Sequence, residues 1–445
     1  MEINMSALPS KNILKIYEAK VGLYKGETPR ITLETKRLQD TCFTAGQKIT
    51  IKYIKDKITV ILDVEGVRQI TSRHGRQVLD IKSKDIQKAF NDISLVKIIV
   101  GSSSIEITPL KEALEQKRAR DKIQTDKDSY DVVDMFCSGG TLAKCFYDNK
   151  KFNILAGIDY DDKKLANYQA NFPDAEIWCG DISNVDWDRY KDAEIVDLTP
   201  SCRPFTEINK TGKKNEHAKE GDNTAHALIG IEKIRPAVIL LEEVPAYQNS
   251  YSYLILKNVL QKMGYCIAEK ILNAKDFGSL SYRKRFCMVA SIKEGFSFLP
   301  IKPFSAKTVK DILEIPYEER EWKQLSKHEA WEKTQVGKGR NFKMDLIDEN
   351  SISVRHPTTR YYDRQTSSFL INKNGRKDFL TPRELARVAD LPDDFILPEN
   401  KKDAVAIIGD GVVYSVFSYV VECIKIHLEA QISKDKKDKN DYGRE

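Results

Sequence analysis

The sequence predicts an α/β protein built around a parallel sheet. Four short apolar segments have the length of buried strands, and each ends in small or polar residues; they are 132–136, 154–159, 193–198 and 238–244. A chain of 445 residues with 41% hydrophobic content can bury a sizeable core. Because α/β folds place ligands at the carboxyl ends of their strands, the residues that follow these segments form the candidate site.

The first strand leads into a tight turn of small residues. Val132 to Phe136 is followed by Ser138-Gly139-Gly140-Thr141 and then by a helix-like stretch from Leu142 to Tyr147. This arrangement turns free helix amides toward a ligand, although an ordinary strand-to-helix turn has the same pattern. Asp159 ends the next strand, about 25 residues further on, where a carboxylate can accept hydrogen bonds from both hydroxyls of a ribose. The pattern therefore favours a nucleotide-like cofactor.

The third and fourth segments end in a cysteine and in paired carboxylates. Cys202 lies between Pro200 and Pro204, so its thiol is held on a stiff turn where α/β enzymes place nucleophiles. A single cysteine is more often an inert core residue. Glu242 and Glu243 end the fourth strand, and an acid in that position rarely lacks a partner or a role. We predict that Cys202 and Glu242 face one substrate.

From about Asp131 to about Ile424, the chain resembles the DNA (cytosine-5) methyltransferase family. The family's motifs occur here in the family's order and spacing. They are Asp134-Met135-Phe136-Cys137-Ser138-Gly139-Gly140, Asp159-Tyr160-Asp161, Gly180-Asp181-Ile182, Pro200-Ser201-Cys202, Glu242-Glu243-Val244, Ser281-Tyr282-Arg283-Lys284-Arg285, and Leu380-Thr381-Pro382-Arg383-Glu384-Leu385-Ala386-Arg387 followed by Leu391-Pro392-Asp393-Asp394-Phe395. One such match is weak, whereas seven in register are specific.

The resemblance implies a Rossmann-like methyltransferase fold with a small target-recognition subdomain, and S-adenosyl-L-methionine as the cofactor. In the family's arrangement, Tyr160 stacks on adenine and Asp181 accepts a hydrogen bond from its amino group. The residues at the family's cofactor-binding positions are Phe136, Ser138, Gly139, Gly140, Asp159, Tyr160, Asp181, Ile182, Pro200 and Asp410. No metal is expected, because the eight cysteines and six histidines show no paired ligand spacing.

The resemblance also assigns the chemistry. Carbon 5 of cytosine is a poor nucleophile, so the Cys202 thiolate would add to carbon 6 and push electron density onto carbon 5. Glu242 would donate or share a proton at ring nitrogen 3, and Arg283 and Arg285 would hold the base oxygen and the neighbouring backbone. The target base must leave the helical stack, which costs about a few kcal/mol. The catalytic residues implied are Cys202, Glu242, Arg283 and Arg285.

Two segments are predicted to contact DNA. The net charge is only +6, so basic residues must be clustered to attract a polyanion. A polar segment just after Cys202 can close on phosphates as a lid, although a solvated loop has the same composition. Its lysines are Lys210, Lys213, Lys214 and Lys219. Residues 294–375 resemble the recognition subdomain, in which Thr359, Arg360 and Tyr361 would contact DNA; a purely structural subdomain is the alternative.

Some positions depart from the family pattern. Ser201 and Arg203 replace the proline and glutamine that usually flank the nucleophile, and Glu243 replaces an asparagine that helps to hold the nucleophile loop. Adjacent carboxylates raise each other's proton affinity, so Glu242 is protonated more readily or the loop is held differently. Asp410 lies where the closing motif has asparagine. Its charge would lie near the methyl donor and would affect donor affinity or even donor identity.

The first 117 residues lie outside this resemblance and contain an internal repeat. Residues 31–62 and 78–108 follow one plan, and the pairs that show it, each offset by 47, are Ile51 with Ile98, Ile58 with Ile105 and Val60 with Ile107. Neither unit can bury a core alone, so we predict that the two form one small β-rich barrel. The region is weakly similar to AbrB-like and SymE-like domains, and a DNA-binding role and a docking role both stay open. Ser72-Arg73-His74-Gly75-Arg76 is its basic loop.

These observations predict the domain boundaries and lead to three hypotheses of function. We expect a β-rich domain at 1–117, a charged linker at 118–130, a catalytic domain at 131–293 and 376–430, and a disordered tail at 431–445. The main prediction is a DNA cytosine-5 methyltransferase of a restriction, phage or mobile-element system. The alternatives are a transfer RNA cytosine-5 methyltransferase, which Thr206 after Phe205 would suit, and an inactive DNA-binding regulator.

Partners and location follow from the same pattern. The expected partners are double-stranded DNA and, in a restriction system, a cognate endonuclease. No segment approaches the roughly 18 apolar residues of a membrane span and no signal peptide is apparent, so we expect a cytoplasmic, nucleoid-associated monomer. The eight cysteines are scattered singly, which favours a reducing compartment.

Overall fold

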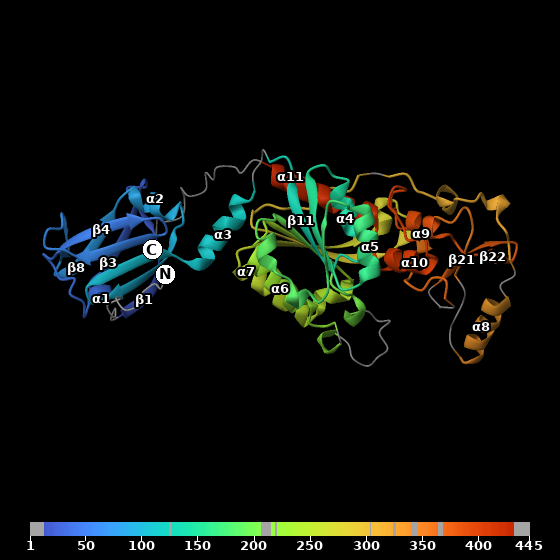
Figure 1. Ribbon diagram of the computed structural model, residues 1–445, viewed down its shortest axis with the longest axis horizontal. Helices are drawn as coiled ribbons and strands as arrows, with labels where there is room; N and C mark the ends of the chain where they lie inside the picture. The colour runs from blue at the N-terminus through green and yellow to red at the C-terminus, as the bar shows by residue number, and fades with distance from the viewer. Residues whose placement is uncertain are drawn as a thin grey trace, which may run out of the picture. The chain divides into compact units, whose positions relative to one another are not determined.

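The computed structural model describes residues 13–123, 127–205, 215–218, 220–302, 304–323, 326–339, 345–363 and 368–430. The chain divides into two units, Met1–Arg118 and Ala119–Glu445 (Figure 1). The boundary falls within helix α3 (Lys111–Asp121). Each unit has its own hydrophobic core, so each is described by itself.

The first unit, blue in Figure 1, consists of two antiparallel sheets. The larger sheet has, in spatial order, β1 (Ile13–Lys20), β9 (Leu95–Gly101), β10 (Ser104–Pro109), β5 (Lys57–Leu62), β4 (Lys48–Ile54) and β6 (Arg68–Gln69). The smaller sheet has β2 (Gly22–Tyr24), β3 (Thr28–Glu34), β8 (Arg76–Lys82) and β7 (Thr71–Arg73). Two short helices, α1 (Thr35–Leu38) and α2 (Asp85–Phe90), complete the unit.

The internal repeat is visible as pseudo-symmetric strand pairing. β3-α1-β4-β5 and β8-α2-β9-β10 follow one plan. β3 pairs antiparallel with β8, its counterpart in the other repeat, and β5 pairs antiparallel with its counterpart β10, so that Ile58 faces Ile107 and Val60 faces Ile105. These four side chains are fully buried. The repeats therefore share one core, but their strands form two separate sheets, so the single small barrel expected from the sequence is wrong in that respect.

The second unit is organised by a seven-stranded sheet. Its spatial order is β13 (Glu176–Cys179), β12 (Phe152–Asp159), β11 (Tyr130–Met135), β14 (Ile195–Leu198), β15 (Val238–Glu243), β18 (Lys284–Ser291) and β16 (Cys266–Asn273). The first five strands are parallel, and β18 is antiparallel to both of its neighbours. The strand order reverses between β11 and β14, which is the point where such sheets open a crevice. This sheet confirms the predicted α/β class.

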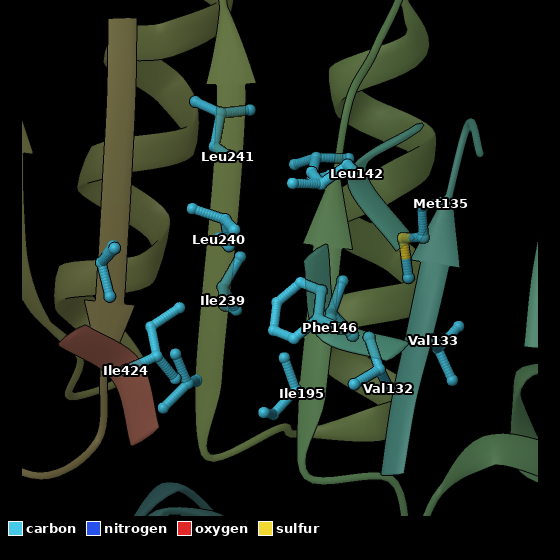
Figure 2. Close-up of a cluster of buried hydrophobic side chains, with 14 of the residues drawn as sticks. Val132, Val133, Met135, Leu142, Phe146, Ile195, Ile239, Leu240, Leu241 and Ile424 are labelled. Carbon is cyan, nitrogen blue, oxygen red and sulfur yellow. The ribbon is translucent and has the colours of Figure 1, made fainter. Parts of the chain in front are cut away.

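Helices cover both faces of this sheet. α4 (Thr141–Tyr147) and α5 (Asp162–Asn171) contact β12, and α11 (Tyr414–Glu429) packs on α4. α6 (Asn223–Ile234) and α7 (Tyr251–Lys262) pack together on the opposite face (Figure 1). Figure 2 shows the core between them, where Val132, Ile195 and Ile239 come from adjacent strands and Phe146 and Ile424 from the covering helices. The central strands are largely apolar because both faces of the sheet are covered.

A third core cluster belongs to a smaller set of elements. These elements are β17 (Ser281–Tyr282), β19 (Asp345–Ile347), β20 (Val354–Arg355), β21 (Phe369–Lys373), β22 (Arg376–Asp378), α8 (Ser326–Gly337), α9 (Pro382–Val388) and α10 (Lys401–Asp410). The buried residues of this cluster run from Leu280 to Ile408. They extend past both ends of the predicted 294–375 subdomain, because Leu280 and side chains of α9 and α10 belong to the same cluster.

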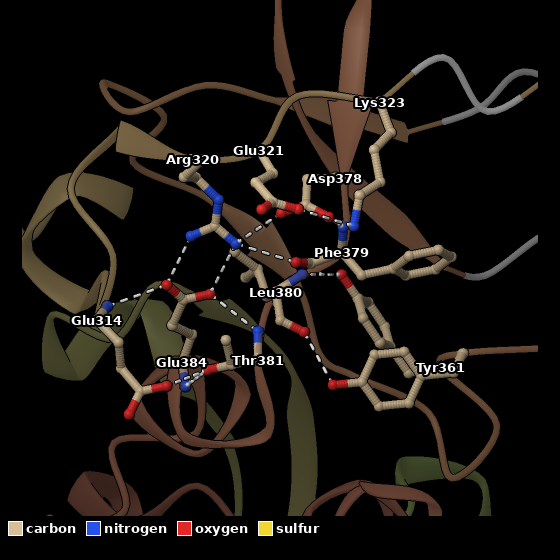
Figure 3. A network of polar contacts seen from close by, with 11 residues as sticks. Glu314, Arg320, Glu321, Lys323, Tyr361, Asp378, Phe379, Leu380, Thr381 and Glu384 are labelled. Carbon is tan, nitrogen blue, oxygen red and sulfur yellow. Dashed lines mark hydrogen bonds and ion pairs between the residues drawn. The ribbon is translucent and has the colours of Figure 1, made fainter. Parts of the chain in front are cut away.

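A buried ion pair joins the segments of this cluster (Figure 3). Both guanidinium ends of Arg320 donate to the Glu384 carboxylate, at 2.6 and 3.2 Å, and both side chains are almost fully buried. Glu384 also accepts from the backbone N–H of Glu314 and of Thr381, each at 2.9 Å. The carboxylate is satisfied on both oxygens, so the charge pair is tolerated inside the core.

Within the described residues, no single helix is long and apolar enough to cross a membrane. α10 and α11 meet that length and composition only as a pair, which is bent by 47°.

Two aspartates are buried side by side in the large sheet. β11 and β14 place Asp134 opposite Asp197, and the two residues are 1% and 0% exposed. Burial raises the pKa of Asp134 to about 7, and burial together with the neighbouring Asp134 raises the pKa of Asp197 well above its ordinary value. Because two adjacent buried carboxyls resist double ionisation, the pair keeps a proton at neutral pH.

We expect this pair to make the unfolding free energy depend on pH. Both pKa values are raised on folding. The contribution of the pair to the unfolding free energy is therefore complete below about pH 4, and it is lost as the pH rises through about 7. Asp197→Asn should stabilise the protein by about 2 kcal/mol at pH 8 and flatten the pH dependence between 5 and 8. Thermal unfolding across this range measures both effects. The exposed Asp188→Asn is the control, and equal pH slopes in the two variants would contradict the assignment.

Candidate active site

The site lies at the carboxyl edge of the parallel strands, where two hollows adjoin. The first hollow has a volume of about 410 Å³ and is lined by Phe136, Ile158, Asp159, Tyr160, Gly180, Asp181, Ile182, Glu220, Asp222, Asn223 and His226. The second is lined by Phe136, Ser138, Asp159, Tyr160, Lys164, Thr199, Pro200, Ser201, Cys202, Arg203, Asn223, Glu242, Arg283, Arg285 and Asp410. Four residues belong to both linings, so the hollows form one continuous cleft.

The loop after β11 has an unusual backbone. Phe136 and Ser138 adopt φ values of +64° and +48°, in the left-handed region that non-glycine residues rarely occupy. The Ser138 N–H donates to Asp159 at 2.9 Å and so ties this loop to the end of β12. A backbone held in a sparsely populated region by its surroundings is common at ligand sites.

The two glycines of this loop pack behind the cleft rather than lining it. A Cβ at Gly139 would lie 2.5 Å from Ile407, and one at Gly140 would lie 2.4 Å from Phe172. Gly140 also has φ +86°. A side chain at either position would therefore meet Ile407 or Phe172, which favours glycine at both. Neither glycine lines the two hollows, and their contact with a cofactor stays a prediction.

Asp159 lies at the junction of the two hollows. One carboxylate oxygen accepts from the Ser138 N–H, and the other accepts from the Asp161 N–H at 3.0 Å. Burial raises the pKa of this carboxyl despite these amides. Tyr160 is exposed beside it and lines both hollows. The acid is thus fixed in position while its neighbour's ring stays accessible.

The far end of the first hollow is formed by Asp181 and Ile182. Asp181 caps the short helix Ile182–Asn184 by accepting from the Ser183 N–H at 2.9 Å, and this contact lowers the pKa of its carboxyl. The carboxylate is therefore ionised and fixed at neutral pH. Ile182 is buried below it.

Cys202 is held by a turn that is anchored in the core. Its backbone carbonyl accepts from the Phe205 N–H at 3.0 Å, and the Phe205 ring packs edge-on against Tyr247 with centroids 4.8 Å apart. Burial and then the nearby Glu243 raise the pKa of the thiol to about 11, whereas Arg285 and Arg283 oppose that rise. The thiol is therefore protonated at neutral pH in the absence of a substrate.

Glu242 and the paired arginines face Cys202 across the second hollow. The antiparallel pairing of β15 and β18 sets Glu242 diagonal to Arg285, whose Nε lies 2.7 Å from the carboxylate. Arg283 is buried and donates to the Gly409 carbonyl at 3.2 Å. Burial and the nearby Arg285 lower its pKa to about 9, so it stays charged at neutral pH. The structure thus brings all four predicted catalytic residues together.

Glu243 points to the other face of the sheet. It lies opposite Phe286, whose ring packs on Tyr253 of α7 at 4.8 Å, and it is 1% exposed. Burial, with Glu242 adding to it, raises the pKa of its carboxyl well above the ordinary value. A neutral carboxyl can donate a hydrogen bond as an amide can. This fits the position, because the family that the chain resembles has asparagine here.

Asp410 has a partner that the sequence did not indicate. It ends α10, and Lys164 from the first turn of α5 lies 2.8 Å from its carboxylate. Both line the second hollow. Lys164, Thr199 and Asn223 are cleft residues that sequence reasoning missed. A lysine in the first turn of a helix is electrostatically unfavourable, and this is the signal that could have singled out Lys164.

The residues predicted to contact DNA differ in their burial and in their partners. Tyr361 is 0% exposed and its hydroxyl accepts from the Leu380 N–H at 3.2 Å, so its predicted contact with DNA is wrong (Figure 3). Its ring fills the third core cluster. Arg360 is exposed and pairs with Asp363 at 2.7 Å, and Thr359 is half-buried with its backbone against Gly409. The predicted lid residues Lys210, Lys213, Lys214 and Lys219 lie outside the described residues.

Comparisons with known proteins agree with this geometry. Residues 130–426 match the family model described as C-5 cytosine-specific DNA methylase. The chain is 27% identical over 315 residues to "Type II methyltransferase M.SsoII" of Shigella sonnei, covering 68% of this chain and 81% of the relative. It is 28% identical over 321 residues to "Type II methyltransferase M.NlaX" of Neisseria lactamica, covering 68% and 98%.

Solved structures share the fold at low identity. The S. pombe Dnmt2 methyltransferase superposes with a TM-score of 0.54 at 21% identity, covering 68% of this chain and 98% of that one. The Entamoeba histolytica methyltransferase EhMeth gives 0.56 at 16% identity, covering 68% and 98%. The first unit lies outside the segment matched by the family model.

We expect the Cys202 thiol to react slowly until high pH. Its raised pKa predicts an alkylation rate that climbs about tenfold per pH unit with no plateau below pH 10. Glu243→Gln should shift the plateau to lower pH, because Glu243 is the carboxyl that raises the pKa of the thiol most, after burial itself. Site-resolved mass spectrometry of iodoacetamide-treated protein measures the rate. Glu232→Gln, at an exposed position, is the control, and a plateau near pH 8.5 in the wild type would refute this description.

Proposed function

The chain belongs to the C-5 cytosine-specific DNA methylase family, and on that premise we propose that it transfers a methyl group from S-adenosyl-L-methionine to carbon 5 of a flipped cytosine through a covalent adduct with Cys202. The methyltransferase fold and the DNA cytosine-5-methyltransferase activity predicted from the sequence are confirmed by this membership and by the type II relatives. The observation that carries the finer proposal is the convergence of Cys202, Glu242, Arg283 and Arg285 in one hollow.

The first hollow suits the adenosine part of the cofactor. Its volume is within the range of small-molecule sites. The Asp159 carboxylate at the junction can accept from ribose hydroxyls, Tyr160 can stack on the adenine ring, and Asp181 can accept from the adenine amino group. These residues would hold the cofactor, which would supply an electrophilic methyl group beside the second hollow.

In the second hollow, the protein's residues would activate the base. The Cys202 sulfur would form a bond to carbon 6 while Glu242 supplies a proton to ring nitrogen 3, so that negative charge does not accumulate on the ring. Arg285 holds the Glu242 carboxyl in place at 2.7 Å. The proton that the thiol loses on substrate binding would pass to the Glu242 carboxylate, which then delivers it to nitrogen 3, and the charges of Arg283 and Arg285 favour that loss. Once the methyl group has left the donor sulfur and bonded to carbon 5, a base such as water would take the carbon 5 proton. The electrons of that C–H bond would re-form the ring double bond as the bond between carbon 6 and sulfur breaks, so that Cys202 leaves as a thiolate and nitrogen 3 returns its proton to Glu242.

Double-stranded DNA is the substrate that the family membership implies. The names of the type II relatives support a restriction-modification setting, in which a cognate endonuclease would recognise the same site. The alternative transfer RNA substrate has no comparable support. Decay of the site is also disfavoured, because all four reactive side chains line the same hollow.

We expect Cys202→Ala to lower methyl transfer to duplex DNA by at least about a thousandfold. Transfer of labelled methyl to mixed-sequence duplex DNA and to transfer RNA measures this, with the exposed Cys179→Ala as the matched control. Duplex DNA containing 5-fluorocytosine should trap a covalent complex with the wild type, because fluorine cannot leave as the proton does. Label on DNA without trapping would refute the covalent step, and label on transfer RNA alone would reverse the substrate assignment.

A second proposal concerns the first unit, which we infer contributes to DNA affinity through its charge. The first 118 residues contain 21 Lys and Arg and 14 Asp and Glu, whereas the remaining 327 contain 51 and 52. On the smaller sheet, Asp80 is shared by three cations, Arg30 at 2.7 Å, Lys82 at 3.1 Å and Arg73 at 3.3 Å. Lys82 also lies 3.9 Å from the centre of the partly exposed Tyr24 ring. This excess of cations favours a phosphate backbone over the docking alternative.

The double variant Arg73→Glu/Lys82→Glu should weaken binding to a duplex made only of adenine and thymine, which offers no target cytosine. The slope of log affinity against log salt concentration should fall by about 2, because two phosphate contacts are lost. Lys52→Glu/Lys55→Glu makes the same charge change near the end of β4 in the larger sheet and should alter the slope less. Equal effects of the two double variants would show that only net charge matters and would contradict a local binding surface.

A further inference from the structure

The ion pair between Lys164 and Asp410 is built into the wall of the cleft. The Lys164 Nζ lies 2.8 Å from the Asp410 carboxylate, and the side chains are 17% and 28% exposed. The two residues are 246 positions apart in the chain and come from α5 and α10. Both line the hollow that contains Cys202. Opposite charges are therefore presented side by side to whatever occupies this part of the cleft.

Each partner lies at the electrostatically unfavourable end of its helix. Lys164 is in the first turn of α5, near the partial positive charge of the helix N-terminus. Asp410 is the last residue of α10, near the partial negative charge of the C-terminus. Helix stability does not account for either residue. A partly buried ion pair also contributes little net stability, because both ions lose hydration.

The position of the pair matches the remaining part of the donor. The adenosine hollow is at one end of the cleft, Asp159 is at the junction, and Cys202 with Glu242 marks the place of the base. The donor must extend past the ribose, and the amino acid chain on its sulfur needs a polar environment. Ser138 lies in that wall as well, and its hydroxyl is buried with no hydrogen-bond partner among the described residues.

We propose that Lys164 and Asp410 bind the α-amino acid end of the donor, Lys164 pairing with its carboxylate and Asp410 with its ammonium group. The inference rests on the proposed function, since it takes S-adenosyl-L-methionine as the donor. Without the ligand, the two side chains satisfy each other. With it, each exchanges its partner for the opposite charge of a zwitterion, so neither charge is left unpaired in the cleft. The Asp410 charge, which departs from the family pattern, then serves recognition of the ammonium group.

The test compares ligands that differ only at this end. Full-length protein is titrated calorimetrically, without DNA, with S-adenosyl-L-homocysteine, with its decarboxylated analogue, and with 5′-methylthioadenosine, which lacks the amino acid. The wild type should bind S-adenosyl-L-homocysteine at least about thirtyfold more tightly than 5′-methylthioadenosine. Lys164→Met should lower the affinity for S-adenosyl-L-homocysteine at least about tenfold and change the affinity for 5′-methylthioadenosine by less than about twofold.

The analogue separates the two partners. Affinity for the decarboxylated analogue should be insensitive to Lys164→Met and should still fall in Asp410→Asn. Lys163→Met, an exposed lysine in the same helical turn, is the matched control and should change none of the affinities. Lys164→Arg keeps the charge and should restore the preference for the carboxylate, which guards against a variant that merely unfolds.

Three results would overturn the inference. If Lys164→Met lowers the affinities for all three ligands equally, the pair only holds α5 and α10 together and does not bind the amino acid end. Unchanged affinity for S-adenosyl-L-homocysteine in both variants would leave the pair without a role in binding. Failure of the wild type to bind S-adenosyl-L-homocysteine at all would refute the proposed donor itself, and this result is distinguishable because it appears before any variant is made.

Discussion

Parallel hydrogen bonding between β11, β14 and β15 is the constraint on which the site depends. Its register places Met135, Leu198 and Leu241 level with one another at the strand ends. Parallel strands in register end at one edge of a sheet, so the turns that follow them must meet there. The cofactor-type loop, the Cys202 turn and Glu242 are thereby collected from positions about a hundred residues apart in the chain, before any side chain interacts with another.

The electrostatics of the second unit follow from the burial that this sheet imposes. Asp134, Asp197 and Glu243 are all fully buried at or near strand ends, where ionised carboxylates are costly. Their raised pKa values mean that protons, rather than counter-ions, remove most of that cost. Arg283 and Arg285 oppose the rise in the pKa of the Cys202 thiol, which suits a developing thiolate.

The third core cluster shows the opposite solution to a buried charge. Arg320 and Glu384 are paired, and the carboxylate also accepts backbone amides from two segments. This fixes the start of α9 relative to the segment that carries Arg320, and the neighbouring Leu380 N–H donates to the hydroxyl of the buried Tyr361. The same cluster includes Ile407 and Ile408 of α10, so the helix that ends in Asp410 is held by the packing of the small subdomain rather than by the large sheet alone.

The sequence by itself determined the α/β class, the strand ends that carry Asp159, Cys202 and Glu242, and the repeat of the first unit. These are local patterns of burial, turn residues and spacing, and local patterns survive folding unchanged. It misjudged Tyr361, since an aromatic residue between polar neighbours has the same pattern whether it packs inward or contacts a ligand. Only the tertiary structure decided that the glycines pack against Ile407 and Phe172 and that Asp410 meets Lys164. The physical reason is that such contacts join residues far apart in the chain, and their distance depends on how whole elements pack.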